Sequence, residues 1–165
     1  MSISSLDIRK RETSEEVWAL QHPAYRMEAA LIGVANLPPL QDTVQTLQSC
    51  GESFLGFRSE DGELVGAVSY EREQSGHFAI CRLMVHPDSM RRGIGTLLLQ
   101  SLIDAEAAGT VWSVTAEVRN YPAIRLYERF GFERRETFKP IPGIELVRML
   151  RSEVPVKGQD NQPPT

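Results

Sequence analysis

The chain alternates between short apolar runs and amphipathic stretches, and this pattern predicts both strands and helices. Apolar-rich runs at 53–59, 63–72 and 77–85 are each the length of one strand. Asp61-Gly62 joins the first two runs, and an Asp-Gly pair between apolar runs is a strong hairpin signal. We therefore expect three consecutive antiparallel strands in the middle of the chain.

The N-terminal part predicts an opening strand and two helices. The strand lies within residues 4–10, and the helix after it begins near Thr13 or Ser14, either of which would cap it. The stretch 22–40 is ambiguous, because part of it has helical spacing and its Leu-Pro-Pro-Leu end breaks a helix. A second helix is expected at 42–48, with Gly following it.

After the third strand, the apolar spacing predicts a helix that starts in a glycine-containing loop and ends near Ala108. Its inward positions are expected to be Ile94, Leu97, Leu98, Leu102 and Ala105. A strand at 110–118, a short helix at 122–130, and strands at 132–138 and 143–150 follow.

The strand–helix–strand passage from 77 to 118 requires a right-handed parallel crossover, whereas the other connections are antiparallel. We expect an α/β fold: a mixed, mostly antiparallel sheet of about seven strands flanked by about four helices. The 165 residues suit one domain, which we place at 1–152, with a disordered tail at 153–165.

Composition excludes several classes of protein. Eighteen Lys and Arg against 22 Asp and Glu give a net charge of −4, which disfavours nucleic-acid binding. No apolar run approaches the roughly 20 residues that cross a bilayer, and the N-terminus lacks the apolar run of a secretory signal. Cys50 and Cys81 have no metal-like spacing, so we expect reduced thiols in a cytoplasmic protein without membrane partners.

The most informative segment, residues 83–99, runs from a strand through a basic loop into a helix start. Unpaired N–H groups at a helix N-terminus, with Arg91 and Arg92 beside them, suit a pyrophosphate. Alternatively, Gly93 and Gly95 only permit a tight loop with solvated arginines. A P-loop lysine is missing before the threonine after Gly95, and Leu98 replaces the third glycine of a dinucleotide fingerprint.

Two patterns together resemble the GNAT superfamily of N-acetyltransferases. In that family a strand ends in Val-x-Pro, and a loop Arg/Gln-x-x-Gly-x-Gly/Ala then opens a helix. Further along comes Asn-x-x-Ala-x-x-x-Tyr-x-x-x-Gly-Phe. This chain carries Val85-His86-Pro87 and Met90-Arg91-Arg92-Gly93-Ile94-Gly95, then Asn120, Ala123, Tyr127 and Gly131-Phe132 in register. The resemblance extends over residues 4–150 and is clearest at 53–134.

The resemblance implies a GNAT-like single-domain fold and direct transfer of an acetyl group from acetyl-coenzyme A to a primary amine, without a metal. The loop at 91–96 would hold the cofactor's pyrophosphate, and the strand before it would pair with the pantetheine arm, between strands 77–86 and 110–118 that splay apart. A backbone N–H near Met84 or Val85 would polarise the thioester carbonyl. The implied acetyl-CoA-binding residues are Leu83, Met84, Val85, Arg91, Arg92, Gly93, Ile94, Gly95, Thr96 and Asn120.

Tyr127 matches the family tyrosine near the leaving sulfur. An unperturbed tyrosine has a pKa near 10, so it can protonate a departing thiolate as general acid. Its spacing also fits a half-buried tyrosine packed with Ala123 and Phe130, and Asn120 could equally cap a helix. Met90 stands where the family usually has Arg or Gln, and Ser89 where an aromatic is common.

The general base stays open between three glutamates and a water chain, because each carboxylate also fits an exposed strand position. The glutamates are Glu71, Glu73 and Glu117. The histidines are too scattered for a metal site, and we expect a structural role for the one before Pro87. They are His22, His77 and His86.

The acceptor is a primary amine of a small molecule or a peptide, and the resemblance assigns its recognition to 13–52 and 134–145, which carry no readable motif. It also allows a homodimer. An alternative is a catalytically silent acyl-CoA-binding module or sensor of the same fold. A nucleotide- or nucleic-acid-binding domain is disfavoured by the acidic balance.

Overall fold

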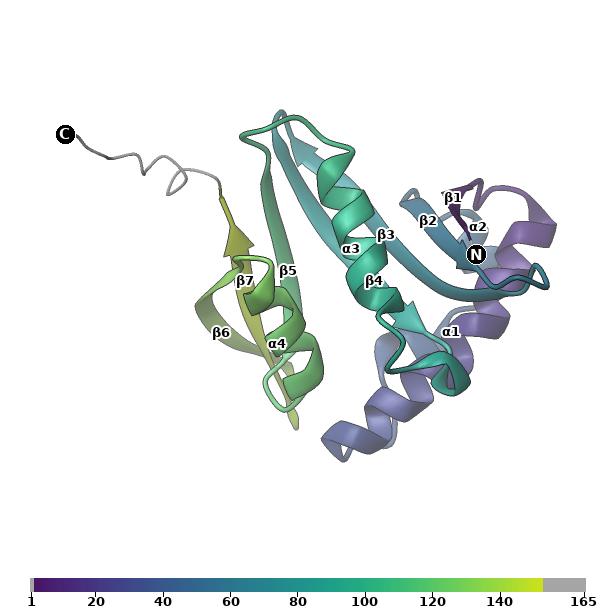
Figure 1. The fold of residues 1–165 in the computed structure, drawn as a ribbon. Coiled ribbons are helices and arrows are strands. Elements are labelled where there is room, and N and C mark those ends of the chain that lie inside the picture. Colours follow the sequence, from purple (N-terminus) through teal and green to yellow (C-terminus); the bar gives the residue numbers. More distant parts are fainter. Residues whose placement is uncertain (1, 153–165) are drawn as a thin grey trace. The chain divides into compact units, whose positions relative to one another are not determined.

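In the computed structural model, which describes residues 2–152, seven strands form one mixed sheet in the order β1-β2-β3-β4-β5-β7-β6 (Figure 1). The strands are β1 Ser2–Leu6, β2 Ser53–Arg58, β3 Leu64–Gln74, β4 His77–Val85, β5 Val111–Glu117, β6 Glu133–Ile141 and β7 Ile144–Arg151. The α-helices are α1 Arg11–Ile32, α2 Val44–Gln48, α3 Ile94–Asp104 and α4 Tyr121–Arg129. The expected fold class is confirmed. The tail expected at 153–165 lies outside the described residues.

The chain forms two compact units. The first contains the residues up to Glu71 together with Ile80–Ala105, and the second contains Arg72–Ala79 together with the residues from Glu106 on. Among residues 2–152, no helix combines the length and apolar character needed to cross a bilayer.

The expected hairpin between β2 and β3 is present. Ser59 N–H donates to the Glu63 carbonyl at 2.9 Å, and Gly62 N–H donates to the Ser59 carbonyl at 3.0 Å. Gly62 has a φ of 88°, the left-handed conformation that its lack of a Cβ permits.

Helix α1 differs from the prediction at both ends. It begins at Arg11 with Lys10 at the N-cap, so Thr13 and Ser14 do not cap it. Ser14 is instead fully buried and donates from Oγ to the Val44 carbonyl at 2.7 Å. The helix continues through Pro23 to Ile32, which resolves the ambiguous stretch; Val17, Leu20, Tyr25, Ala29 and Ile32 are buried along it.

Helix α3 packs closely on β3 at Gly66. A Cβ added there would lie 2.7 Å from Ile94 Cγ2 and 3.2 Å from Leu98 Cδ1. The expected inward stripe was partly wrong, because Leu97 is 48% exposed and Ala105, at the C-cap, is also exposed. The buried positions are Ile94, Leu98, Leu99, Leu102 and Ile103. Apolar residues lie on both sides of the central stripe, Leu97 on one side and Leu99 and Ile103 on the other. Packing on the sheet buries Leu99 and Ile103 and leaves Leu97 exposed.

In the second unit, β5 pairs in parallel with one neighbouring strand, β4, and antiparallel with the other, β7. Its parallel register with β4 pairs His77 with Val111, Phe78 with Trp112, and Ala79 with Ser113. Phe78 stacks on the buried Trp112 with ring centroids 5.1 Å apart. On the other side β5 pairs antiparallel with β7, which forms a hairpin with β6.

A buried carboxylate fixes the end of β5 to the start of β7. Glu117 Oε2 accepts from the Arg119 guanidinium at 2.7 Å and from Glu145 N–H at 3.0 Å, and Oε1 accepts from Arg119 N–H and Nε. Hydrogen bonds from Arg119 lower the pKa of Glu117 to about 2, although burial opposes the shift.

Replacing Gly66 by Ala tests the contact between α3 and β3. The added methyl meets Ile94 Cγ2, so we expect Gly66→Ala to lower the free energy of unfolding by about 1–3 kcal/mol in urea denaturation. Leucine at position 94 lacks the Cγ2 methyl, so in an Ile94→Leu background Gly66→Ala should lower the free energy of unfolding by less. Equal costs in both backgrounds would contradict the contact.

The Glu117 hydrogen bonds predict a pH-dependent stability. The folded-state pKa lies below the usual 4.5, so the stabilisation is present above pH 4.5 and lost as pH falls toward about 2. We expect Glu117→Gln to lower the free energy of unfolding by about 1–3 kcal/mol at neutral pH, and the difference from wild type to shrink on acidification.

The matched control is Glu73→Gln, because Glu73 is exposed on β3. Its effect should stay within about 0.5 kcal/mol at every pH in the same denaturation series. If the difference in free energy of unfolding between the wild type and Glu117→Gln did not change with pH, Arg119 would not hold this carboxylate ionised.

Candidate active site

The loop between β4 and α3 has two residues in the left-handed region. Gly93, at the N-cap of α3, has a φ of 77°, and Arg91 has a φ of 66°. A non-glycine residue in this conformation is uncommon, so the loop is held in a specific shape. Arg91, Arg92 and Gly93 are exposed.

The N-terminus of α3 has no side-chain cap and no acidic residue in its first turn. The Gly93 carbonyl accepts the Leu97 N–H at 3.0 Å, which starts the helical bonding. The N–H groups before that bond have no acceptor within the helix, and they form the positive end of the helix dipole. Together with Arg91 and Arg92, this arrangement suits a phosphate group.

The loop before the helix is anchored by His86. Its N–H donates to the Val65 carbonyl on β3 at 2.8 Å, and its Nδ1 accepts from Asp88 N–H at 3.1 Å. The expected structural role for this histidine agrees with both hydrogen bonds. Within residues 2–152, no group of three or more His, Cys, Asp or Glu is placed to hold a metal ion.

The structure places the predicted donor-site residues in both units. Leu83, Met84 and Val85 end β4 in the first unit, where Met84 is buried. The same unit contains the loop and helix start at 91–96. Asn120 and Tyr127 belong to the second unit.

Asn120 and Tyr127 have structural contacts of their own on α4. Asn120 is the N-cap, and its Oδ1 accepts from Ala123 N–H at 3.3 Å. Tyr127 is 5% exposed and packs on Phe132, with ring centroids 5.6 Å apart. Both readings anticipated for these residues, a structural and a functional one, are thus compatible with their positions.

The three candidate bases have different surroundings. Glu117 carries a lowered pKa and four hydrogen bonds to its oxygens, so it is a poor proton acceptor at neutral pH. Its candidacy is not supported. Glu71 and Glu73 are exposed on β3.

Sequence reasoning missed a partly buried polar cluster around Arg82. The Arg82 guanidinium donates to both oxygens of Glu52, at 2.8 and 3.2 Å, and to Asp42 Oδ2 at 2.6 Å. It also donates to Gln21 Oε1 on α1 at 3.0 Å. The available signal was an arginine inside the apolar run at 77–85, because a guanidinium that is mostly removed from water needs hydrogen-bond acceptors.

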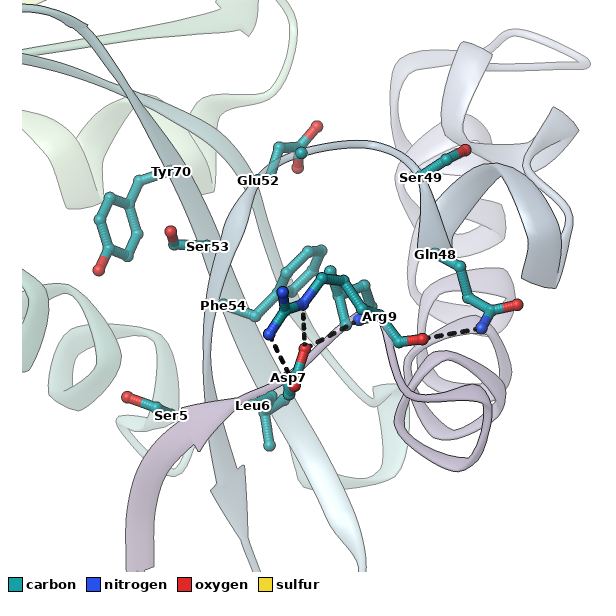
Figure 2. A pocket seen from close by; sticks show the side chains of 12 residues that line it. Ser5, Leu6, Asp7, Arg9, Gln48, Ser49, Glu52, Ser53, Phe54 and Tyr70 are labelled. Atoms are coloured by element: carbon teal, nitrogen blue, oxygen red, sulfur yellow. Dashed lines mark hydrogen bonds and ion pairs between the residues drawn. The ribbon is translucent and has the colours of Figure 1, made fainter.

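Glu52 also lines a cavity of about 780 Å³ in the first unit (Figure 2). The lining comes from β1 and the loop after it, the end of α2, the loop between α2 and β2 that contains Glu52, the start of β2, and β3. Neither of the cysteines near this cluster, Cys50 and Cys81, forms a disulfide within residues 2–152, and burial raises the pKa of the Cys81 thiol to about 12.

Comparison with known proteins agrees with this geometry. The family model described as the acetyltransferase (GNAT) family matches residues 13–132. The UPF0157 protein YqkA of Bacillus subtilis is 42% identical over 145 residues, which cover 87% of this chain and 41% of that protein. The [ribosomal protein bS18]-alanine N-acetyltransferase of Salmonella typhimurium is 33% identical over 84 residues, or 50% of this chain and 57% of the relative. The matches span less than two thirds of the relatives' lengths.

Solved structures show the same fold. The ribosomal-protein-S18-alanine N-acetyltransferase of Escherichia coli superposes with a TM-score of 0.72 at 20% identity, over 92% of both chains. The paia N-acetyltransferase of Thermoplasma acidophilum, in complex with coenzyme A, has a TM-score of 0.68 at 16% identity, over 92% of this chain and 99% of that one. With the family model matching most of its length, the chain belongs to the acetyltransferase (GNAT) family.

Proposed function

We propose that the protein transfers an acetyl group from acetyl-coenzyme A to a primary amine. The observation that carries this proposal is the uncapped N-terminus of α3 behind a loop with two left-handed residues, Arg91 and Gly93. Membership of the GNAT family supports it.

In this proposal the donor binds mainly through backbone groups. The N–H groups of residues 93–96 hold the pyrophosphate, with Arg91 and Arg92 supplying positive charge. Leu83–Val85 pair with the pantetheine arm, a backbone N–H there polarises the thioester carbonyl, and Asn120 hydrogen-bonds the arm.

Met90 is 44% exposed at the position where the family usually has Arg or Gln. Backbone N–H donors do not depend on that side chain, so its replacement lowers the affinity for acetyl-CoA without removing the site. The two following arginines offset part of the lost charge.

The proposed reaction is a direct transfer. The ammonium of the acceptor loses one proton to a base or to water, and the amine nitrogen then attacks the thioester carbonyl carbon. The new C–N bond forms as the C–S bond breaks, and the departing thiolate takes a proton from Tyr127. The amide nitrogen releases its second proton, which returns to the Tyr127 oxygen directly or through water. Holding both reactants together supplies much of the acceleration.

The acceptor is a primary amine of a small molecule or of a peptide N-terminus. Relatives whose names specify a ribosomal-protein alanine as acceptor favour the peptide. An amine panel for this protein should therefore contain a peptide beginning with alanine.

A second candidate is a silent acyl-CoA-binding module. The structural contacts of Tyr127 and Asn120 favour it, since packing on Phe132 and capping α4 explain both residues without catalysis. Such a module would bind acetyl-CoA at the same donor site as the enzyme, so only a measurement of turnover distinguishes the two candidate functions.

Calorimetric titration with acetyl-CoA tests the donor site. We expect binding by the wild type, and about tenfold weaker binding or worse in Gly93→Asp, because the added carboxylate repels the pyrophosphate. The matched control is Gly62→Asp: its φ of 88° imposes the same backbone strain, and a Cβ at either glycine has no neighbour within 4 Å. The control should bind acetyl-CoA normally.

No binding by the folded wild type would overturn both the enzyme and the silent module. Equal weakening by the two glycine variants would instead show that backbone strain, rather than charge at the α3 N-terminus, reduces the affinity.

Tyr127→Phe separates the enzyme from the silent module. Phenylalanine keeps the packing on Phe132, so acetyl-CoA binding should persist, whereas kcat should fall about a hundredfold because the proton donor is lost. Steady-state release of coenzyme A measures kcat. An unchanged kcat would remove Tyr127 from the mechanism, and a wild type that binds acetyl-CoA but acetylates nothing in the panel would favour the silent module.

A further inference from the structure

The second half of β4, Ile80–Val85, is an edge segment of the first unit. The parallel register between β4 and β5 pairs His77–Ala79 with Val111–Ser113, and within residues 2–152 it extends no further along β4. The paired part of β4 belongs with β5 to the second unit, whereas Ile80–Val85 belongs to the first, where its strand neighbour is β3. A strand with one neighbour offers backbone groups to an added chain, but it is also held from one side only.

The side chain of Arg82, in the middle of this edge segment, joins it to three other parts of the chain. Arg82 donates to Glu52 Oε1 and Oε2 at 2.8 and 3.2 Å, in the loop before β2. It also donates to Asp42 Oδ2 at 2.6 Å, ahead of α2, and to Gln21 Oε1 on α1 at 3.0 Å. Hydrogen bonds from the side chain therefore support the strand where β5 does not.

The groups that accept from Arg82 are themselves fixed. Glu52 Oε1 also accepts from Ser69 Oγ on β3 at 2.7 Å. The buried Gln21 amide donates to Asp42 Oδ2 and to the Pro39 carbonyl, both at 2.9 Å. A guanidinium that binds such a frame has one position, because its donors lie in a rigid plane. The Arg82 cluster consists of Gln21, Asp42, Glu52, Ser69 and Arg82.

The three charged members of the cluster are largely removed from water. The exposed fractions of the Arg82, Asp42 and Glu52 side chains are 12%, 19% and 13%. Burial disfavours the charged forms of Asp42 and Arg82, but hydrogen bonds within the cluster outweigh it, lowering the pKa of Asp42 and raising the pKa of Arg82. Release of Arg82 would leave two carboxylates without their cation, so the guanidinium stays bound.

A second arginine in the same unit provides a contrast. Arg58 on β2 donates to both oxygens of Glu16 on α1, at 2.7 and 2.8 Å, and to the Gly62 carbonyl at 3.0 Å. Its strand has β1 on one side and β3 on the other. Both neighbouring strands hold β2 in place, so the ion pair of Arg58 is not needed to fix the backbone there.

We propose that Arg82 is a positioning residue for acetyl-CoA: the Arg82 cluster holds the edge segment of β4 where Leu83–Val85 can pair with the pantetheine arm. The proposal rests on the proposed acetyltransferase function and adds a determinant of donor affinity outside the loop at 91–96. Arg82 acts through the strand and does not touch the donor. Binding of the pantetheine arm consequently depends on Arg82, whereas binding of the phosphates at the start of α3 does not.

Two ligands that differ in the pantetheine arm test this dependence by calorimetry. Acetyl-CoA contains the arm, and adenosine 3′,5′-bisphosphate is the phosphate-bearing portion without it. In Arg82→Met we expect the Kd for acetyl-CoA to rise about fivefold or more, and the Kd for the bisphosphate to change by less than about twofold. A role confined to global stability would leave the ratio of the two Kd values unchanged in the folded variant.

The matched control is Arg58→Met, which removes an equally two-pronged ion pair between α1 and the sheet and should bind both ligands as wild type does. Arg82→Lys keeps the positive charge without the planar fork, so its Kd for acetyl-CoA should lie between those of wild type and Arg82→Met. The triple variant Arg82→Met/Asp42→Asn/Glu52→Gln leaves neither carboxylate of the cluster unpaired. It therefore avoids the charge repulsion that could unfold Arg82→Met, and its acetyl-CoA binding should stay weak.

Amide hydrogen exchange of the free protein gives a readout without ligand. Among the amides of Ile80–Val85 that are protected in the wild type, exchange should be about tenfold faster in Arg82→Met, because the segment loses its side-chain support. Amides of β2 should change less in the same variant. In Arg58→Met the amides of Ile80–Val85 should exchange at the wild-type rate.

The proposal is overturned if folded Arg82→Met binds acetyl-CoA as wild type does, or if both ligands are weakened equally. Wild-type affinity in the triple variant would also overturn it, since repulsion between carboxylates, rather than the lost support, would then explain the single variant. Failure of the proposed function looks different: the wild type itself would not bind acetyl-CoA, or would bind it with the predicted dependence on Arg82 and transfer no acetyl group.

Discussion

Helix α3 packs on β3 at Gly66, where the missing side chain leaves room for Ile94 and Leu98, and the proposed donor site depends on this contact. The position of a Cβ at Gly66 is occupied by Ile94, the first residue of α3. Because Ile94 is buried in the contact, the start of the helix is fixed on the sheet. The adjoining N–H groups and the left-handed Gly93 consequently have a defined direction at the end of β4.

The first unit also carries charged groups of both signs. Two arginines precede the start of α3, which has no acidic residue in its first turn, whereas Asp42 and Glu52 are both paired with Arg82. Arg82, between them in the chain, links the acidic cluster to the strand that we assign to the thioester.

Local signals predicted most of the fold. Asp61-Gly62 specified its hairpin, and the loop before Ile94 specified a helix start, because turn and cap chemistry act over a few residues. The course of α1 through Pro23 was not predictable in this way: tertiary packing of its apolar face outweighs the lost hydrogen bond. The apolar spacing allows either Leu97 or Leu99 to be buried, and only the packing of α3 on the sheet determines that Leu99 is the buried one.

The Arg82 cluster could not be predicted from the sequence. Its members come from α1, from the residues before α2 and β2, and from β4, and no spacing along the chain connects Gln21, Asp42 and Glu52. Conversely, Tyr127 and Asn120 were found by a motif, and the structure adds contacts that each makes within its own unit. Contacts between polar groups that lie far apart in the chain are visible only in the folded structure.

The most direct measurement of the central claim is an amide ¹H–¹⁵N NMR titration with the adenosine 3′,5′-bisphosphate portion of coenzyme A, and then with acetyl-CoA. If α3 presents the donor site, the N–H resonances of Gly93, Ile94, Gly95 and Thr96 shift together and saturate, and acetyl-CoA additionally shifts Leu83–Val85. Saturable shifts that leave residues 93–96 unmoved would place the cofactor elsewhere and contradict the account.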